Sequence, residues 1–237
     1  MQTQIEPRIF AMPKTVPTIS VVIPCYGQAH FLSEAIESVL RQSRQADEII
    51  VVNDGSPDNT SEVAKKYPVI LVEKENGGLS SARNAGIKKA TSQFIMCLDA
   101  DDMLRPQALE EHLKIAGDNF ISQCGMLYFG TQVAVFRPMG ATLESMRYSN
   151  SIYCNSVFPK ALWERVGGYD ESETMRLGWE DYLFWYECLK VGATLRTSDY
   201  IALLYRRHGD AMTIQTTHPN LDKIKAYMKT KHPEFIF

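Results

Sequence analysis

Short apolar runs alternate with amphipathic stretches from Ile19 to Leu98. Ile19–Pro24 is rich in β-branched residues and predicts a strand buried on both faces. His30–Gln42 carries apolar residues at helical spacing. The alternation continues with strands predicted at Glu48–Val52, Val69–Val72 and Phe94–Leu98, and helices at Pro57–Tyr67 and Gly78–Ala90. This order predicts an α/β fold with a mostly parallel central sheet and right-handed crossovers.

The pattern is less regular in the rest of the chain. Gly125–Phe136 predicts one or two strands, with a hairpin as one arrangement. Ile152–Phe158 and Tyr200–Arg207 predict further strands, and Glu180–Lys190 predicts an aromatic-rich helix that ends before Gly192. We find no internal repeat, low-complexity tract or obvious linker. We therefore predict a single domain with a Rossmann-like first half and a mixed second half.

The composition is that of an ordinary globular domain, with 45% apolar and 22% charged residues among 237. The formal net charge of −3 argues against a protein that binds nucleic-acid backbones, because such proteins are usually basic. The five cysteines form no C-x-x-C pair, which excludes the usual zinc and redox motifs and favours a reducing, cytoplasmic location. No apolar stretch approaches about 18 residues, so we expect no membrane span, while peripheral association with a membrane stays open.

Polar side chains follow the predicted strands of the first half. Cys25 and Tyr26 follow the first strand, Asp54 ends the second, and Asp99 and Asp101 follow the fourth. In an open α/β sheet, ligands bind outside the carboxyl ends of the strands. Several carboxylates at one edge repel each other unless cations or hydrogen-bond donors compensate them. The sequence therefore predicts a ligand site at this edge of the sheet.

Two groups of these acidic residues have competing interpretations. The carboxylates of Asp99-Ala100-Asp101 point the same way on an extended segment and suit Mg²⁺ or Mn²⁺. The alternative is a polar turn in which Asp102 caps the next helix. Asp54 either organises the turn at Gly55 and Ser56 or accepts hydrogen bonds from a base or ribose.

A glycine-containing turn at Asn76–Asn84 opens a predicted helix. Helix N-termini attract anions, and Arg83 near the first turn adds a positive charge. The alternative is a plain turn with Arg83 on a solvated face. The turn is not a P-loop, because the chain contains no G-x-x-x-x-G-K-[ST] sequence.

Several motifs, taken in order, resemble those of a known enzyme family. They are Pro24-Cys25-Tyr26, VVNDGSPDNT (51–60), NGGLSSARNAGI (76–87), LDADD (98–102), VGGYDE (166–171), WEDYLFW (179–185) and YRRH (205–208). Together they resemble the inverting family 2 glycosyltransferases of GT-A fold, from about Ile19 to His208. The chain departs from the family at Gly27, where Asn is frequent.

The resemblance implies one GT-A-type domain at 18–237 after an extended N-terminal arm at 1–17. Within it we expect a nucleotide-binding half (18–102), an acceptor-binding and catalytic half (103–210) and a C-terminal tail (211–237).

The resemblance also implies roles for particular residues at the donor site. The residues expected to bind the donor are Pro24, Tyr26, Asp54, Arg83, Asp99 and Ala100. Pro24, Tyr26 and Asp54 are expected to hold the base and ribose. Asp101 is expected to ligate Mn²⁺ or Mg²⁺, and His208 to complete metal or phosphate binding.

The acceptor hydroxyl has to lose a proton as it attacks, and a positioned carboxylate serves as general base. Adjacent helix residues point about 100° apart, so Glu180 and Asp181 cannot both face one acceptor. The family resemblance favours Asp181 as the base, with Glu180 as the structural alternative. Weaker candidates for contact with the donor sugar or acceptor are Gly168, Asp170, Trp179 and Glu180.

The expected activity is metal-dependent transfer of a sugar, with inversion, from a nucleotide-diphosphate donor to a hydroxyl group. A UDP-sugar is the favoured donor, and the acceptor is a saccharide, a lipid-linked sugar or another hydroxyl compound. One alternative is a sugar nucleotidyltransferase, which usually carries a G-x-G-T-R-like segment where this chain has CYGQAHF. The other is a nucleotide-sugar-binding module without transfer activity, against which the intact Asp99, Asp101 and Asp181 argue.

Overall fold

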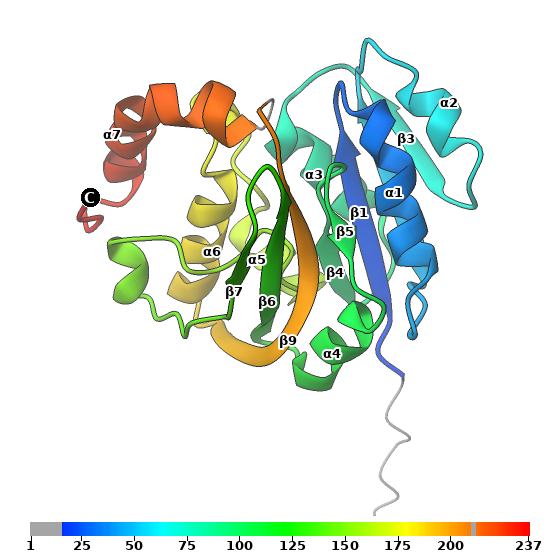
Figure 1. Cartoon of the computed structure of the whole chain (residues 1–237). Coiled ribbons are helices and arrows are strands. Elements are labelled where there is room, and N and C mark those ends of the chain that lie inside the picture. The colour runs from blue at the N-terminus through cyan, green and yellow to red at the C-terminus, as the bar shows by residue number, and fades with distance from the viewer. Residues whose placement is uncertain (1–15, 210–211) are drawn as a thin grey trace, which may run out of the picture.

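The computed structural model of the chain describes residues 16–209 and 212–237 and contains two β-sheets with helices packed around them (Figure 1). The predicted arm at 1–17 lies outside the described residues except for residues 16 and 17. One sheet has the strand order β3-β2-β1-β4-β8 and the other β5-β9-β6-β7. The predicted α/β class is confirmed.

The first sheet is built from the predicted buried runs. Its parallel strands are β1 (Ile19–Cys25), β2 (Glu48–Asp54), β3 (Ile70–Lys74) and β4 (Phe94–Cys97). A short strand, β8 (Phe158–Pro159), joins the β4 edge in the antiparallel direction. The connecting helices are α1 (Ala29–Leu40), α2 (Thr60–Ala64) and α3 (Leu79–Lys89).

Strand β1 is buried on both faces, and its side chains alternate between two cores. Val21 and Ile23 belong to the core under α1, whereas Val22 belongs to the core that includes residues of α3. Gly86 of α3 allows this close packing, because a Cβ at that position would lie 2.3 Å from Cγ1 of Val22. The contact fixes α3 against the sheet and so positions the polar residues of the Asn76–Asn84 turn.

The second sheet confirms the predicted hairpin, because β6 (Phe120–Gly130) pairs antiparallel with β7 (Ala134–Phe136). Strand β9 (Thr194–Arg207) runs parallel to β6 and begins earlier than the predicted Tyr200. The short strand β5 (Met103–Leu104) pairs with β9, and α4 (Ala108–Ile115) packs against β9 and β6. The sequence pattern did not predict β5 or α4.

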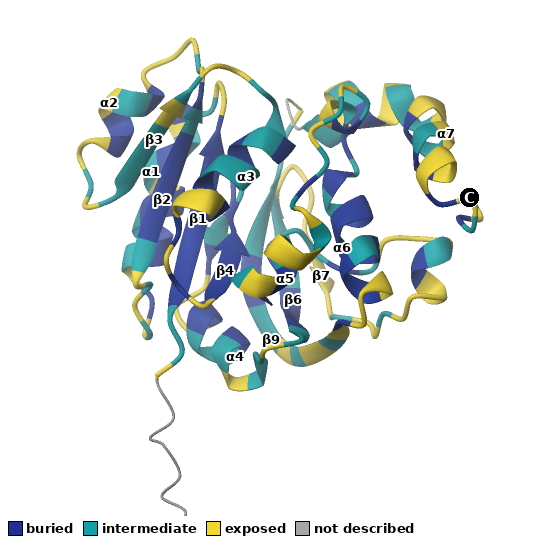
Figure 2. Ribbon diagram, turned by 180° about the vertical axis from the view of Figure 1, so that it is seen from behind, coloured by how far each residue is buried: buried dark blue, intermediate teal, exposed yellow. Residues whose placement is uncertain are grey.

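Helix α6 (Glu180–Lys190) has the predicted bounds, and much of it is coloured as buried in Figure 2. Its aromatic residues Tyr182, Phe184, Trp185 and Tyr186 are all buried in the core. Two further helices, α5 (Lys160–Val166) and α7 (Leu221–Lys231), were not predicted. Short helical turns are η1 (Ser145–Arg147), η2 (Met175–Leu177), η3 (Thr213–Thr217) and η4 (His218–Asn220). Among the helices of the described residues, none has both the length and the apolar character needed to cross a membrane.

The strand predicted at Ile152–Phe158 is wrong except for Phe158, which lies in β8. Ile152, Val157 and Phe158 of this segment are nevertheless buried, whereas Tyr153 and Cys154 are partly exposed. Val157 exchanges two backbone hydrogen bonds with Ser122 of β6, at 2.8 and 2.9 Å, as an isolated bridge. The apolar pattern therefore reflects burial of an irregular segment beneath the second sheet, not strand formation.

Candidate active site

A cavity of about 920 Å³ lies at the carboxyl end of the first sheet and reaches the second sheet, with residues of β1, α3, β6, α6 and β9 in its walls. It brings together most of the residues predicted from the sequence. Those in its lining are Pro24, Tyr26, Asp54, Arg83, Asp99, Ala100, Asp101, Trp179, Glu180, Asp181 and His208. Gly168 and Asp170 do not line it.

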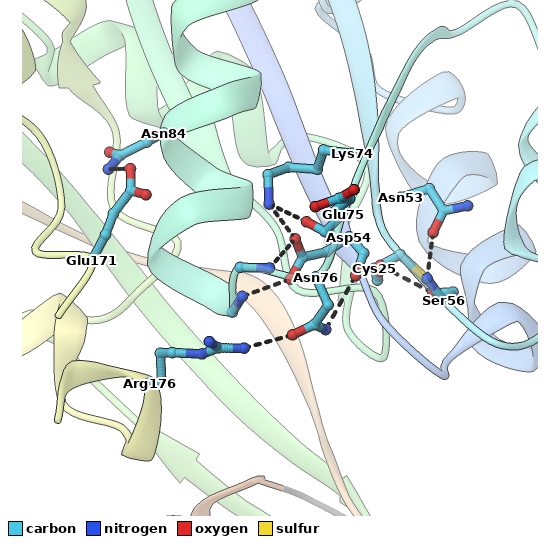
Figure 3. Close-up of polar contacts among 12 residues, drawn as sticks. Cys25, Asn53, Asp54, Ser56, Lys74, Glu75, Asn76, Asn84, Glu171 and Arg176 are labelled. Carbon is cyan, nitrogen blue, oxygen red and sulfur yellow. Dashed lines mark hydrogen bonds and ion pairs between the residues drawn. The ribbon is translucent and has the colours of Figure 1, made fainter. Parts of the chain in front are cut away.

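Asp54 is 2% exposed and sits at the end of β2, where protein groups surround its carboxylate (Figure 3). It accepts hydrogen bonds from the backbone N–H groups of Gly77 and Gly78, at 3.0 and 2.8 Å, and pairs with Lys74 Nζ at 2.6 Å. These donors compensate the buried charge and fix the turn before α3. The turn at Ser56 is instead organised by Asn53, whose Oδ1 accepts the Ser56 N–H at 2.8 Å, so the turn interpretation of Asp54 is wrong.

Arg176 of η2 completes the rim of the cavity beside this turn, although the sequence pattern did not point to it. Its Nη2 donates to Oδ1 of Asn76 at 2.6 Å, and the Asn76 amide in turn donates to the backbone oxygen of Asp54 at 3.1 Å (Figure 3). Gly78 has φ +87°, and a Cβ there would lie 2.9 Å from Cγ of Arg176. Arg176 therefore lies directly over the start of α3.

The carboxylate of Asp101 faces the imidazole of His208 at the end of β9. Asp101 Oδ2 lies 2.9 Å from His208 Nε2 and accepts a hydrogen bond from Gln28 Nε2 at 3.1 Å. Burial, together with the charge of Asp99, raises the pKa of Asp101, and His208 opposes this shift. Gln28, which follows the Pro24-Cys25-Tyr26 motif, was not predicted from the sequence as a residue of this site.

Asp101 and His208 fit the predicted Mn²⁺ or Mg²⁺ ion. Their 2.9 Å separation is close to the distance of about 3 Å between neighbouring ligands in an octahedral site with metal–ligand bonds of about 2.1 Å. Within residues 16–209 and 212–237, no group of three or more His, Cys, Asp or Glu side chains is arranged to hold a metal ion. A metal here would therefore need further oxygen ligands from water and from a bound substrate, which is the usual situation for Mg²⁺ at phosphate sites.

Asp102 is buried and does not cap the following helix. Its Oδ1 accepts a hydrogen bond from the backbone N–H of Arg206 at 2.8 Å, whereas α4 begins after Gln107. Burial and the neighbouring charges of Asp101 and Asp99 raise its pKa well above the usual range. The helix-cap interpretation of Asp102 is therefore wrong, and the residue instead joins the acidic segment to β9.

Arg83 is 1% exposed and joins the two halves of the cavity. Its Nη1 donates to Oε1 of Glu180 at 2.5 Å, and its Nη2 donates to Oδ1 of Asp99 at 2.7 Å. The solvated-face interpretation of Arg83 is wrong, because the side chain is buried. One guanidinium therefore compensates Asp99, one of the carboxylates whose repulsion we anticipated, together with Glu180 of α6.

Glu180 and Asp181 begin α6 and have different surroundings. Glu180 is 5% exposed and bonded to Arg83, whereas Asp181 is partly exposed and its Oδ2 accepts a hydrogen bond from Asn150 Nδ2 at 3.3 Å. Burial raises the pKa of Asp181 to about 7, the charge of Glu180 adds to the shift, and Arg83 opposes it. Glu180 is therefore held in a structural ion pair with Arg83. Asp181 is the carboxylate of the pair that is suited to exchange protons near neutral pH.

Trp179 immediately precedes this pair and lines the cavity in an unusual backbone conformation. Its φ is +62°, the only positive φ of a non-glycine residue among the described residues. Its ring contacts those of Tyr182 and Phe237, at centroid distances of 5.5 and 5.6 Å. Such a strained residue persists only where its surroundings hold it, and it is most often found at functional sites.

Gly168 and Asp170 serve a different part of the fold. Asp170 Oδ2 accepts hydrogen bonds from Lys231 Nζ at 2.5 Å and from the Tyr227 hydroxyl at 2.9 Å. Gly168 packs against Asn84 and the Trp163 ring. Gly168 therefore packs against α3 and α5, and Asp170 is bonded to α7. Neither residue reaches the cavity.

Comparison with known proteins agrees with the motifs. Residues 20–161 match the sequence model of the family described as glycosyl transferase family 2. The chain is 32% identical, over 227 residues, to an uncharacterized glycosyltransferase of Rickettsia typhi, covering 89% of this chain and 70% of that protein. It is 33% identical, over 163 residues, to the uncharacterized glycosyltransferase YibD of Escherichia coli, covering 66% of this chain and 45% of that one.

The fold matches solved structures of TarS from S. aureus. A TarS crystal structure aligns with a TM-score of 0.72 at 17% identity, covering 90% of this chain and 39% of the TarS chain. Residues 1–349 of TarS in complex with UDP-GlcNAc align with a TM-score of 0.73 at 19% identity, covering 90% of this chain and 66% of that one. The predicted GT-A fold is thereby confirmed. By its sequence match and its relatives, the chain belongs to glycosyl transferase family 2 and is a glycosyltransferase.

Proposed function

We propose that this glycosyltransferase moves a sugar from a UDP-sugar to an acceptor hydroxyl, with a divalent cation and with inversion at the anomeric carbon. The observation that carries the proposal is the linkage of Asp99 and Glu180 by the buried Arg83, which holds the acidic donor segment and the start of α6 at one cavity. TarS structures with bound UDP-GlcNAc and with bound UDP support the choice of donor, because they share this fold.

In this proposal the nucleotide lies at the end of the cavity formed by β1 and β2. Pro24, Tyr26 and Asp54 flank the base and ribose, and Arg176 adds positive charge beside them. Asp101 and His208 would hold Mn²⁺ or Mg²⁺. When bound, the cation stabilises the negative charge that develops on the leaving diphosphate.

Asp181 acts as the general base in the proposed reaction. Its carboxylate accepts the proton of the acceptor hydroxyl while the hydroxyl oxygen attacks the anomeric carbon. Glu180 cannot take this role, because its carboxylate is bonded to the buried Arg83. A single base without a separate nucleophile implies direct displacement and therefore inversion.

Nucleotide binding and product analysis test the proposal. Calorimetry with UDP, GDP and dTDP, each with and without Mn²⁺, should show the strongest binding for UDP with Mn²⁺. A screen of UDP-sugars for UDP release should then identify the donor, and NMR of the product should show an inverted anomeric centre. Metal-independent binding of all three nucleotides, or retention of configuration, would contradict it.

Asp101→Asn should raise the Mn²⁺ concentration needed for half-maximal UDP binding by at least tenfold, because the charged ligand is lost. Calorimetric Mn²⁺ titrations in the presence of UDP measure the change. Asp199→Asn is the matched control, since the Asp199 side chain is 84% exposed and does not line the cavity. Equal Mn²⁺ requirements in the two variants would exclude Asp101 as a ligand.

The rate of transfer should rise with pH through about 7, because Asp181 accepts a proton only when it is ionised. Below that pH, kcat/KM should fall about tenfold per pH unit, as the protonated fraction of the free enzyme grows. The charges of Glu180 and Asp99 raise this pKa in addition to burial, and the charge of Arg83 lowers it. A pH profile of initial rates that is flat between pH 5.5 and 8 would rule out a base with this pKa.

A further inference from the structure

We propose that the cavity wall formed by the second sheet and the neighbouring segment 150–154 binds a saccharide acceptor longer than one sugar ring, through Tyr128 and Tyr205 of the sheet and Tyr153 of the segment. The proposal rests on the transferase function given above and adds the chemical class of the acceptor. It concerns residues that carry no role in donor binding or proton transfer.

The space for an acceptor follows from the positions of the other groups. The donor residues Pro24, Tyr26 and Asp54 line the cavity from the carboxyl ends of β1 and β2. The second sheet contributes Tyr128 from β6 and Tyr205 from β9 to the same cavity. The second sheet is therefore one of the walls that remain for an acceptor, together with the segment 150–154 and η3.

The segment 150–154 lies against both the base and the donor carboxylates. At one end, Asn150 Nδ2 donates to Asp181 Oδ2 at 3.3 Å, and at the other, Cys154 Sγ donates to Asp99 Oδ2 at 3.7 Å. Tyr153 lies between these contacts and lines the cavity. An acceptor hydroxyl at Asp181 would therefore have the Tyr153 side chain as a neighbour.

Tyr153 is held in place yet leaves its ring free to contact a ligand. Its hydroxyl donates to the backbone oxygen of Arg137 at 3.1 Å, and its backbone N–H donates to Gln123 Oε1 at 3.0 Å. Among the described residues, its ring pairs with no other aromatic ring or cation. A half-exposed ring with its hydroxyl already bonded is preorganised to stack on the C–H face of a sugar.

Tyr205, Tyr128 and Phe136 form an aromatic row that continues from the cavity to the surface. Tyr128 and Tyr205 are register partners on β6 and β9, with ring centroids 5.0 Å apart. Phe136 of β7 lies 4.4 Å from the Tyr128 ring, is 38% exposed and does not line the cavity. The Arg207 guanidinium lies over the Tyr128 and Tyr205 rings, 5.3 and 6.0 Å from their centroids, so a sugar would contact the remaining faces of this row. The continuation of the row past the cavity to Phe136 favours an acceptor longer than one ring.

The chemistry of this wall also selects a saccharide over a lipid acceptor. Tyrosine combines an apolar ring with a hydroxyl, which matches the alternating apolar faces and hydroxyl edges of sugars. The apolar side chains of Met126, Leu203 and Ile152 also line the cavity, but Asn150 and Thr213 interrupt them, so they form no unbroken aliphatic groove for a hydrocarbon chain.

Acceptor kinetics with the full chain, Mn²⁺ and the UDP-sugar from the donor screen test the inference. The acceptor probes are cellotetraose, chitotetraose and maltotetraose, their monosaccharides, and dodecyl phosphate as a lipid probe. We expect at least one tetrasaccharide to have an acceptor KM about tenfold below that of its monosaccharide. Tyr153→Ala should raise this KM about tenfold and leave the donor KM within twofold, whereas Tyr153→Trp should keep the acceptor KM within threefold.

Tyr148→Ala is the matched control, because Tyr148 is 51% exposed and does not line the cavity, and its acceptor KM should not change. Transfer to dodecyl phosphate alone, equal KM values for tetrasaccharides and monosaccharides, or an unchanged acceptor KM in Tyr153→Ala would overturn the inference. The tetrasaccharide comparison uses the unaltered chain and so does not depend on the folding of a variant. The absence of UDP release from every donor would instead refute the transferase function itself.

Discussion

Asp181→Asn is expected to lower kcat for sugar transfer by about 10²–10⁴-fold, while the Kd for UDP stays within threefold of that of the unaltered chain. The amide has nearly the shape of the carboxylate but cannot accept the acceptor proton. Asp181 contacts Asn150 and the N–H of Tyr182 at the start of α6, and neither contact involves the donor residues. The loss should therefore appear in turnover and not in nucleotide binding.

The control for this substitution is Asp222→Asn, which removes the same charge from the first turn of α7, on an exposed part of the chain. Initial rates at saturating donor, together with calorimetric UDP binding, measure both quantities. Turnover of Asp181→Asn within threefold of the unaltered chain would show that another group takes the proton.

Arg83→Met should lower the free energy of unfolding by about 3–5 kcal/mol, because it leaves the buried carboxylate of Glu180 without its partner. Asp99 loses the same guanidinium but is partly exposed, so the larger share of the cost comes from Glu180. Denaturant unfolding followed by circular dichroism measures the difference.

Two further variants separate the loss of the ion pair from the loss of a long side chain. Arg41→Met removes an exposed ion pair with Glu37 and should change the unfolding free energy by less than about 1 kcal/mol. The double variant Arg83→Met with Glu180→Gln should recover part of the loss, because no ionised Glu180 remains buried. A loss of less than about 1 kcal/mol in Arg83→Met would show that the stability of the fold does not depend on the ion pair between Arg83 and Glu180.

The sequence pattern predicted the parallel strands of the first sheet well because β1, β2 and β4 are short runs of mostly buried apolar residues, and β1, β2 and β3 are each followed by a helix. The pattern also predicted the bounds of α6 correctly, because aromatic and other apolar residues run through most of that helix. The helices α4, α5 and α7 were missed because they are short or expose most of their surface, and in α7 only Ile224 and Met228 are buried. The segment 152–158 was misread because its apolar residues are buried without forming a regular strand.

The residues of the candidate site were largely predicted, whereas their contacts were not. The motifs correctly predicted that Asp54, Asp99 and Asp181 lie together. The carboxyl ends of β2 and β4 and the start of α6 meet at one cavity. Arg83 and Glu180 lie 97 positions apart in the sequence. A local sequence pattern cannot predict an ion pair between residues so far apart. Arg176 and Gln28 were missed for the same reason, since each becomes part of the site only through tertiary contacts.

The pairing of Arg83 with both Asp99 and Glu180 restricts how the chain can be recombined with its relatives. Arg83 and Asp99 come from the first half of the chain and Glu180 from the second, so a hybrid that exchanges the halves has to match one guanidinium to two carboxylates. The hairpin of β6 and β7 contributes no residue to this triad, whereas Cys154 of the segment 150–154 donates to Asp99. A graft that tests the proposed acceptor surface should therefore exchange the hairpin and keep Cys154 and the three charged residues together as one inherited unit.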